Sequence, residues 1–141
     1  MKRKIFVDTN IVLDFLCTRA PFSKYAAQLF SLAEKKKFII CISTLSFTTV
    51  HYFLLKQLGR EKARNILSQF KVLITILPID EHIIDMALTS DFKDFEDAVQ
   101  YYCAISENIS VFITRNIKDY MKAKITVMSA EDFLKVELKK L

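Results

Sequence analysis

KIFVDTNIVLDFL, at residues 4–16, decides the fold of this chain. The short run at 4–7 ends at Asp8, which is typical of a buried parallel strand with a polar group at its carboxyl end. The next residues, 10–16, have the spacing of a short helix. Ligands of open α/β sheets bind at the carboxyl ends of the strands. Asp8 therefore occupies the position where such a fold places its site.

Strand-like and helix-like segments alternate along the rest of the chain. Apolar runs predict strands at 38–42, 72–77, 110–114 and 125–128. Helices are predicted at 23–36, 43–58, 60–70, 80–89, 96–107 and 129–138, with N-caps at Ser23, Ser43 and Asp80 and a stop at Gly59. This alternation implies a three-layer α/β/α fold around a mostly parallel sheet of four to five strands.

The composition favours a single packed domain over residues 1–141. Hydrophobic residues make up 52% of the chain, and a chain of this length buries a core without disulfides or structural metals. With one Gly and two Pro, the sequence has no linker, repeat or low-complexity segment. The first apolar run is too short for a signal peptide or a membrane span, so we expect a cytoplasmic protein without a membrane partner.

Negative charge is concentrated in one part of a basic protein. The formal net charge is +5, which favours an anionic partner such as nucleic acid, yet seven of the sixteen acidic residues fall between positions 80 and 97. Asp94 and Asp97 share a face if a helix begins by Asp94. Asp119 closely follows a later predicted strand, and parallel strands end at the same edge of a sheet. Four carboxylates are therefore predicted to converge on one crevice: Asp8, Asp94, Asp97 and Asp119.

Such a cluster suits a hydrolytic metal site. Like charges repel one another, and Mg²⁺ or Mn²⁺, which prefer oxygen ligands and keep several waters, would neutralise them. The cation would activate a water and stabilise charge on a phosphate, which suits phosphodiester hydrolysis with the four aspartates as catalytic residues. In a purely structural interpretation, Asp8 caps the helix at 10–16 and the acids at 91–97 occupy a solvated helix N-terminus.

Three ordered blocks resemble the PIN-domain family, especially toxins of the VapC type: FVDTNIVLDFL at 6–16, DFEDAVQYYCA at 94–104 and VFITRNIKDY at 111–120. The likeness extends from about Lys4 to Leu134. It implies a Mg²⁺- or Mn²⁺-dependent endoribonuclease for single-stranded RNA, with metal ligands Asp8, Asp97 and Asp119 and with Asp94 near the metal. It also implies supporting side chains at Asn10, Thr49, Glu96, Thr114 and Asn116.

One position departs from the family pattern. PIN nucleases usually carry a Glu in the helix after the second strand, at about Thr48 or Thr49 of this chain, and no acid occurs here between Glu34 and Glu61. A Thr hydroxyl is a neutral, weak ligand, so either Asp94 substitutes for the Glu or metal affinity and activity are reduced. The departure concerns catalysis rather than fold.

The resemblance implies three partners, namely RNA, an antitoxin protein and a second copy of the chain in a homodimer. Among the basic residues that would guide an RNA backbone, Arg115 is nearest in sequence to the proposed site. Two other functions remain: a PIN-like module that has lost its chemistry and binds RNA or a protein, and a phosphoacceptor receiver domain. The receiver needs an acid at the end of a central strand, whereas the second and third predicted strands end at Ser43 and Pro78.

Overall fold

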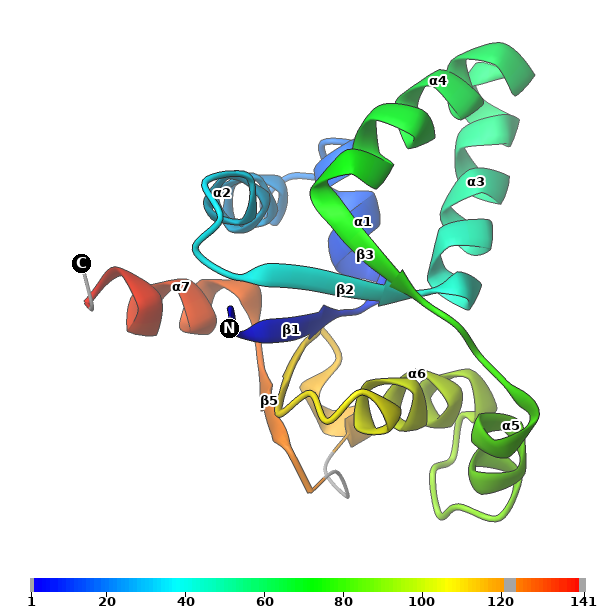
Figure 1. The fold of residues 1–141 in the computed structure, drawn as a ribbon. Helices are drawn as coiled ribbons and strands as arrows, with labels where there is room; N and C mark the ends of the chain where they lie inside the picture. The colour runs from blue at the N-terminus through cyan, green and yellow to red at the C-terminus, as the bar shows by residue number, and fades with distance from the viewer. Residues whose placement is uncertain (1, 121–123, 140–141) are drawn as a thin grey trace.

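A parallel sheet forms the centre of the computed structural model, which describes residues 2–120 and 124–139 (Figure 1). The sheet of the described residues has five strands in the order β3-β2-β1-β4-β5, and all four neighbouring pairs are parallel. The strands are β1 (Lys4–Val7), β2 (Ile39–Ser43), β3 (Ile74–Leu77), β4 (Val111–Ile113) and β5 (Thr126–Met128). The predicted sheet is confirmed.

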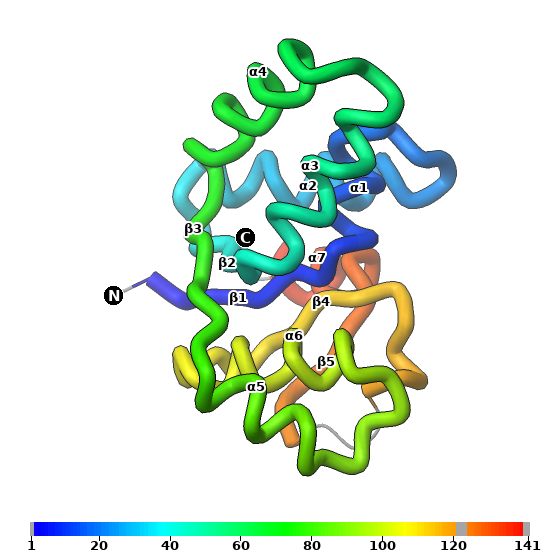
Figure 2. The backbone as a smooth tube through the Cα atoms, turned by 90° about the vertical axis from the view of Figure 1, so that its right-hand side faces the viewer, coloured from blue at the N-terminus to red at the C-terminus, as the bar shows by residue number. Residues whose placement is uncertain are grey.

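Helices cover both faces of this sheet, so the fold has three layers (Figures 1 and 2). The α-helices are α1 (Thr9–Leu16), α2 (Ser23–Glu34), α3 (Thr44–Leu58), α4 (Arg60–Phe70), α5 (Glu81–Leu88), α6 (Phe95–Ser106) and α7 (Ala130–Leu138). Two 3₁₀ helices are η1 (Lys71–Leu73) and η2 (Ile117–Tyr120). Residues of α5 and α6 pack on one face, and residues of the other α-helices on the opposite face. In the described part of the chain, no helix is long and apolar enough to cross a membrane.

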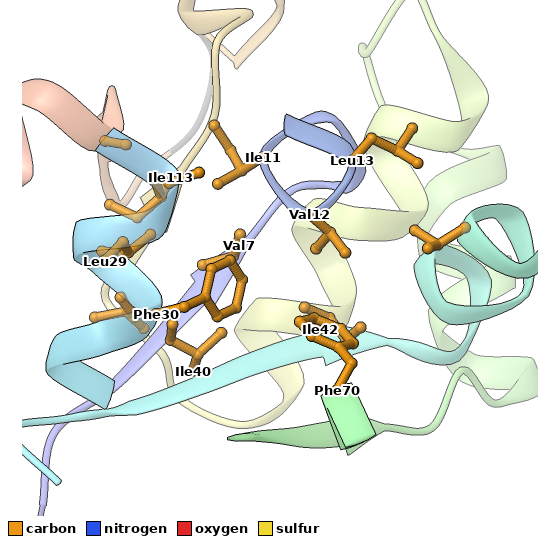
Figure 3. Packing of buried hydrophobic residues seen from close by; sticks show 14 of the residues in the cluster. Val7, Ile11, Val12, Leu13, Leu29, Phe30, Ile40, Ile42, Phe70 and Ile113 are labelled. Carbon is orange, nitrogen blue, oxygen red and sulfur yellow. The ribbon is translucent and has the colours of Figure 1, made fainter. Parts of the chain in front are cut away.

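Successive residues of β1 supply the two halves of the core. Ile5 and Val7 join the cluster of α1 to α4 and α7, whereas Phe6 faces α5 and α6 and stacks on Phe112 with the ring centroids 4.9 Å apart. Figure 3 shows Val7 among the side chains that fill the first cluster. Full burial of such a side chain contributes about 1.5–3 kcal/mol. Burial on both faces is why this strand is an unbroken apolar run in the sequence.

The strand order reverses beside β1, and this reversal positions the site. From β1 the chain passes to β2 on one side, while β4 lies on the other side. Such a switch point opens a crevice beyond the carboxyl ends of the strands. The Asp8 backbone N–H donates to the Ile113 carbonyl oxygen at 2.9 Å, which brings Asp8 next to Thr114 although 106 residues separate them in sequence.

Two of the three predicted N-caps are confirmed. The side chains of Ser43 and Asp80 each accept a hydrogen bond of 3.0 Å from the backbone N–H three residues later. The prediction of Ser23 as a cap is wrong, because Ser23 is already the first residue of α2 and Phe22 occupies the cap position without a side-chain bond. Phe22 has helical dihedral angles (φ −79°, ψ −24°), so the chain begins to turn before Ser23.

Two predicted segments begin or end two residues inside their expected bounds. The strand predicted at 72–77 begins at Ile74, because the preceding residues form η1 and the Val72 side chain is 84% exposed instead of joining the core. The helix predicted at 23–36 ends at Glu34, because Lys36 has a φ of 63°, in the left-handed region that ends helices.

Candidate active site

Three side-chain hydrogen bonds hold Asp8 in a nearly closed environment. Asp8 is 6% exposed, and its Oδ1 accepts from the Thr9 N–H at 2.8 Å as the N-cap of α1. Thr114, directly after β4, donates its hydroxyl to Oδ2 at 2.8 Å, and Gln100 of α6 donates Nε2 to Oδ1 at 3.3 Å. Burial raises the pKa of Asp8, while these three donors act in the opposite direction. Asp8 therefore caps a helix and also presents a carboxylate at the sheet edge.

Gln100 links three helices to β2 through a buried amide that no sequence motif marked. Its Nε2 donates to Ser46 Oγ at 2.7 Å and lies 3.3 Å from Thr9 Oγ1, and the Ser43 hydroxyl donates to its Oε1. The hydroxyls of Thr9 and Ser46 are 2.6 Å apart. The one sequence signal for Gln100 was its spacing of three from Asp97, which places both on one face of α6. The network fixes the start of α3 against Asp8.

Asp97 is half-buried in the first turn of α6. The Tyr120 hydroxyl donates to its Oδ1 at 3.1 Å. Burial and then repulsion by Asp94, with smaller contributions from Asp8 and Asp119, raise the pKa of Asp97 to about 6. Burial is therefore the main cause of this shift, and the neighbouring aspartates add to it.

Asp94 and Asp119 share a cavity with Asp97. Asp94 is the N-cap of α6, and its Oδ1 accepts from the Asp97 N–H at 3.1 Å, which confirms that the helix begins next to Asp94. Asp119 lies in η2 and is exposed. The cavity has a volume of about 620 Å³, and Lys118 also lines it. The structure therefore brings three of the four predicted carboxylates together here.

Asp8 and Asp97 line a second cavity of about 250 Å³. Four residues predicted to support the site line it too, namely Asn10, Thr49, Glu96 and Asn116. Of Asp94 and Glu96, it is Glu96 that lines this cavity, because residues two apart at the start of a helix point in different directions. Asp97 is the carboxylate common to the two cavities.

The structure distinguishes the two threonines considered for the missing helix acid. Thr48 is exposed, and its hydroxyl donates to the carbonyl oxygens of Thr44 and Leu45 at 3.2 and 3.0 Å. Thr49 is half-buried and lines the cavity of Asp8 and Asp97. Thr49 therefore occupies the wall of α3 that faces the carboxylates.

Arg115 forms an ion pair beside the site. Its Nε lies 3.0 Å from Oδ2 of Asp14, a fully buried residue of α1, and its Nη2 donates to Oδ1 at 3.2 Å. Its guanidinium carbon lies 4.0 Å from the ring centroid of Phe22. Burial raises the pKa of Asp14, while Arg115 and then Arg19 act in the opposite direction. A role of Arg115 in RNA binding stays a prediction.

The donor set fits a hydrated divalent cation. Among the described residues, no group of three or more His, Cys, Asp and Glu side chains is arranged to hold a metal ion by itself. Mg²⁺, however, is commonly bound by one or two carboxylates together with waters and substrate phosphates. Asp8 and Asp97 supply such a pair in one cavity, and Asp94 and Asp119 line the neighbouring cavity with Asp97. Asp119 as a further ligand stays a prediction.

Known proteins resemble this chain in sequence. The model of the PIN-domain family matches residues 4–118. Ribonuclease VapC1 of Aquifex aeolicus (strain VF5) is 28% identical over 135 residues, which cover 92% of each chain.

Solved structures share the fold. A toxin–antitoxin complex from Klebsiella pneumoniae matches with a TM-score of 0.68 and 23% identity, covering 89% of this chain and 97% of that chain. VapBC2 from Rickettsia felis, bound to a DNA fragment from its promoter, matches with a TM-score of 0.65 and 19% identity, covering 89% and 97%. At these identities the structural matches show the fold alone.

Proposed function

The chain belongs to the PIN-domain family, and on that basis we propose that it is a divalent-metal-dependent endoribonuclease for single-stranded RNA. The observation that carries this proposal is the cavity lined by both Asp8 and Asp97, which come from the end of β1 and the first turn of α6. The similarity to Ribonuclease VapC1 supports the same class of activity. We also propose that residues 1–141 form one domain, because the described elements pack on one sheet.

Asp8 and Asp97 would hold Mg²⁺ or Mn²⁺, with Asp119 and Asp94 adding negative charge beside Asp97. When bound, the cation supplies an activated water and neutralises charge that develops on the phosphate. Thr114 donates to one oxygen of Asp8 and Gln100 to the other, so the carboxylate is oriented before any ligand arrives. Tyr120 orients Asp97 in the same way. Carboxylates held by buried partners need little rearrangement on binding, which favours catalysis.

Asp8→Asn is expected to abolish RNA cleavage, because it removes a negative charge from the site with little change of shape. Expression of the parent protein is expected to arrest growth, and expression of the variant is not. The measurements are cleavage of single-stranded RNA with Mg²⁺ or Mn²⁺ and growth after induction. Asp85→Asn, which changes an exposed acid of α5, is the matched control. Equal toxicity and equal cleavage by parent and Asp8→Asn would contradict the proposal.

We further propose that the chain is the toxin of a toxin–antitoxin pair, with RNA, an antitoxin protein and a second copy of the chain as partners. The Klebsiella pneumoniae complex with the same fold supports an antitoxin partner. The helix α3 also exposes apolar side chains that a protein partner would cover: Tyr52, Phe53, Leu55 and Leu58.

The second candidate function is a module that has lost its chemistry and binds RNA or a protein. Thr49 favours it, because a neutral hydroxyl lines the cavity where the family usually has a carboxylate. This candidate predicts RNA binding that a chelator does not change, and no cleavage with any divalent metal.

Thr49→Glu tests whether the missing acid limits metal binding. A new carboxylate in the cavity of Asp8 and Asp97 is expected to tighten Mn²⁺ binding about threefold to tenfold, because an added charge at a partly solvated site contributes on the order of 1 kcal/mol. Calorimetric titration of Mn²⁺ measures the change. Thr49→Gln fills similar space without charge and serves as the control. Equal affinities for the Glu and Gln variants would show that position 49 is too far from the cation to matter.

A further inference from the structure

Arg19 brings a positive charge to the acidic cavity. It lines the cavity of about 250 Å³ with Asp8, Asp97 and Glu96, and it is the only cationic side chain among the described residues of that wall. Its backbone is fixed from both sides, since its N–H donates to the Asp14 carbonyl oxygen at 3.1 Å and its own carbonyl oxygen accepts from the Ser23 N–H at 2.7 Å. The cavity therefore has carboxylates from β1 and α6 and a guanidinium from the segment after α1.

The guanidinium of Arg19 lies near an aromatic ring of α3. Its central carbon lies 5.9 Å from the ring centroid of Phe53, a half-exposed residue. Leu45, Thr49 and Phe53 are spaced by four, and all three line the same cavity, so they form one face of α3. Arg19 is thus placed at the edge of this face, next to the position where the family usually has an acid.

No carboxylate neutralises Arg19 directly. Among the described residues, no Asp or Glu lies within ion-pair distance of its side chain. Arg19 acts on Asp14 at longer range, but the ion pair with Asp14 is made by Arg115. Because α3 presents Thr49 here, the guanidinium remains available to an anion that enters the cavity.

We propose that Arg19 binds the phosphodiester of the RNA strand in the cavity that Asp8 and Asp97 also line. This inference rests on the proposed function and adds a residue to it. A guanidinium donates two parallel hydrogen bonds to the non-bridging oxygens of a phosphate, and a cation on the carboxylate side would contact the same group. Negative charge that develops on the phosphate during cleavage would also be stabilised by Arg19. Because Thr49 stands where the family usually has an acid, Arg19 would have no carboxylate partner at that position and would be free to bind the substrate.

The test measures RNA binding apart from cleavage. The Asp97→Asn protein, which is expected to cut RNA far more slowly than the parent, is titrated into a short fluorescent oligouridylate, and binding is followed by anisotropy. The same titration is made with this protein carrying Arg19→Gln, Arg19→Lys or Arg64→Gln. Arg64 is an exposed residue of α4, so Arg64→Gln removes the same charge elsewhere. Arg19→Gln is expected to weaken binding about tenfold, as for the loss of a hydrogen bond to a charged group. It should also reduce the slope of log Kd against log salt concentration by about 0.7, as for one phosphate contact on a single strand.

Arg19→Lys is expected to keep the salt slope and lose part of the affinity, because an ammonium keeps the charge but not the paired donors. The proposal is overturned if Arg19→Gln binds like Arg64→Gln, if its affinity falls without a change of salt slope, or if the Asp97→Asn protein does not bind the oligouridylate at low salt. Thermal melting verifies folding of each variant. Failure of the proposed function would give a different result, namely a parent protein that neither binds Mn²⁺ nor cleaves RNA. The single variant Arg19→Gln is expected to bind Mn²⁺ at least as tightly as the parent.

Discussion

Asp97→Asn is expected to lower RNA cleavage by roughly 10²–10³-fold, the size of effect seen when one contribution to transition-state stabilisation is lost. The variant would hold more weakly the cation that neutralises charge on the phosphate. The same substitution is expected to raise the melting temperature of the metal-free protein at pH 7. The negative charge of Asp97 is held against burial and against Asp94 in the folded protein. Asn removes that charge and keeps an oxygen for the Tyr120 hydroxyl. RNA cleavage is therefore expected to need Asp at position 97, whereas the stability of the metal-free protein would be higher with Asn.

The pH dependence of this effect follows from the raised pKa. Asp97 has a pKa of about 6 in the folded protein against 3.8 for the unperturbed group, so between these values the folded protein binds more protons than the unfolded chain. Stability of the metal-free protein therefore falls as the pH rises from about 4 to 6. With allowance for partial exposure, the destabilisation at pH 7 is about 1–2 kcal/mol.

Melting curves of the parent and Asp97→Asn at pH 4 and pH 7 measure this difference. The variant is expected to melt about 3–6 °C higher at pH 7 and at the same temperature as the parent at pH 4. Asp85→Asn, at an exposed position, should show neither effect. Addition of Mn²⁺ should raise the melting temperature of the parent more than that of the variant, since a ligand stabilises the folded state that binds it. A lower melting temperature for Asp97→Asn at pH 7 would contradict this interpretation of the site.

Arg115→Ala is expected to destabilise the protein by about 2–4 kcal/mol, because it leaves Asp14 buried without its partner. The Asp14 side chain is fully buried, whereas that of Arg115 is 28% exposed. The expected loss of stability is therefore somewhat smaller than for a pair in which both side chains are buried. The stacking of Arg115 on Phe22 is lost as well. Urea unfolding of the parent and the variant measures the change.

The double variant Asp14→Leu with Arg115→Met is the matched comparison. It fills similar space without charge, and apolar replacement of a buried ion pair is often neutral or stabilising, so most of the lost stability should return. An Arg115→Ala variant within about 0.5 kcal/mol of the parent would show that the ion pair contributes little, as exposed pairs do.

The sequence was sufficient for the fold because the three central strands, β1, β2 and β4, are largely buried on both faces. Such strands appear as apolar runs, and their alternation with helices predicted the parallel sheet and the approach of Asp8 to Thr114. The apolar run at 72–77 predicted a strand that begins too early, because an apolar side chain such as Val72 can also lie at the surface. Periodicity alone does not report burial.

The candidate site was only partly predictable. Asp8 and Asp97 followed from position and spacing, but Gln100 contacts Ser46 and Asp8 across 54 and 92 residues, and no local pattern encodes such bonds. The sequence also did not show in which direction the arginine side chains point. Arg115 is adjacent to Thr114 in sequence yet pairs with Asp14, whereas Arg19, three residues after the block at 6–16, lines the cavity.

Calorimetric titration of Mn²⁺ into the purified parent and Asp97→Asn proteins tests the central claim most directly, because metal binding requires no knowledge of the RNA target. A two-carboxylate site predicts that the parent binds Mn²⁺ and that Asp97→Asn binds it at least about tenfold more weakly, since one of two charged ligands is lost. Equal affinities, or a folded parent that binds no Mn²⁺, would contradict a metal site on Asp8 and Asp97 and would favour a PIN domain that acts by binding alone.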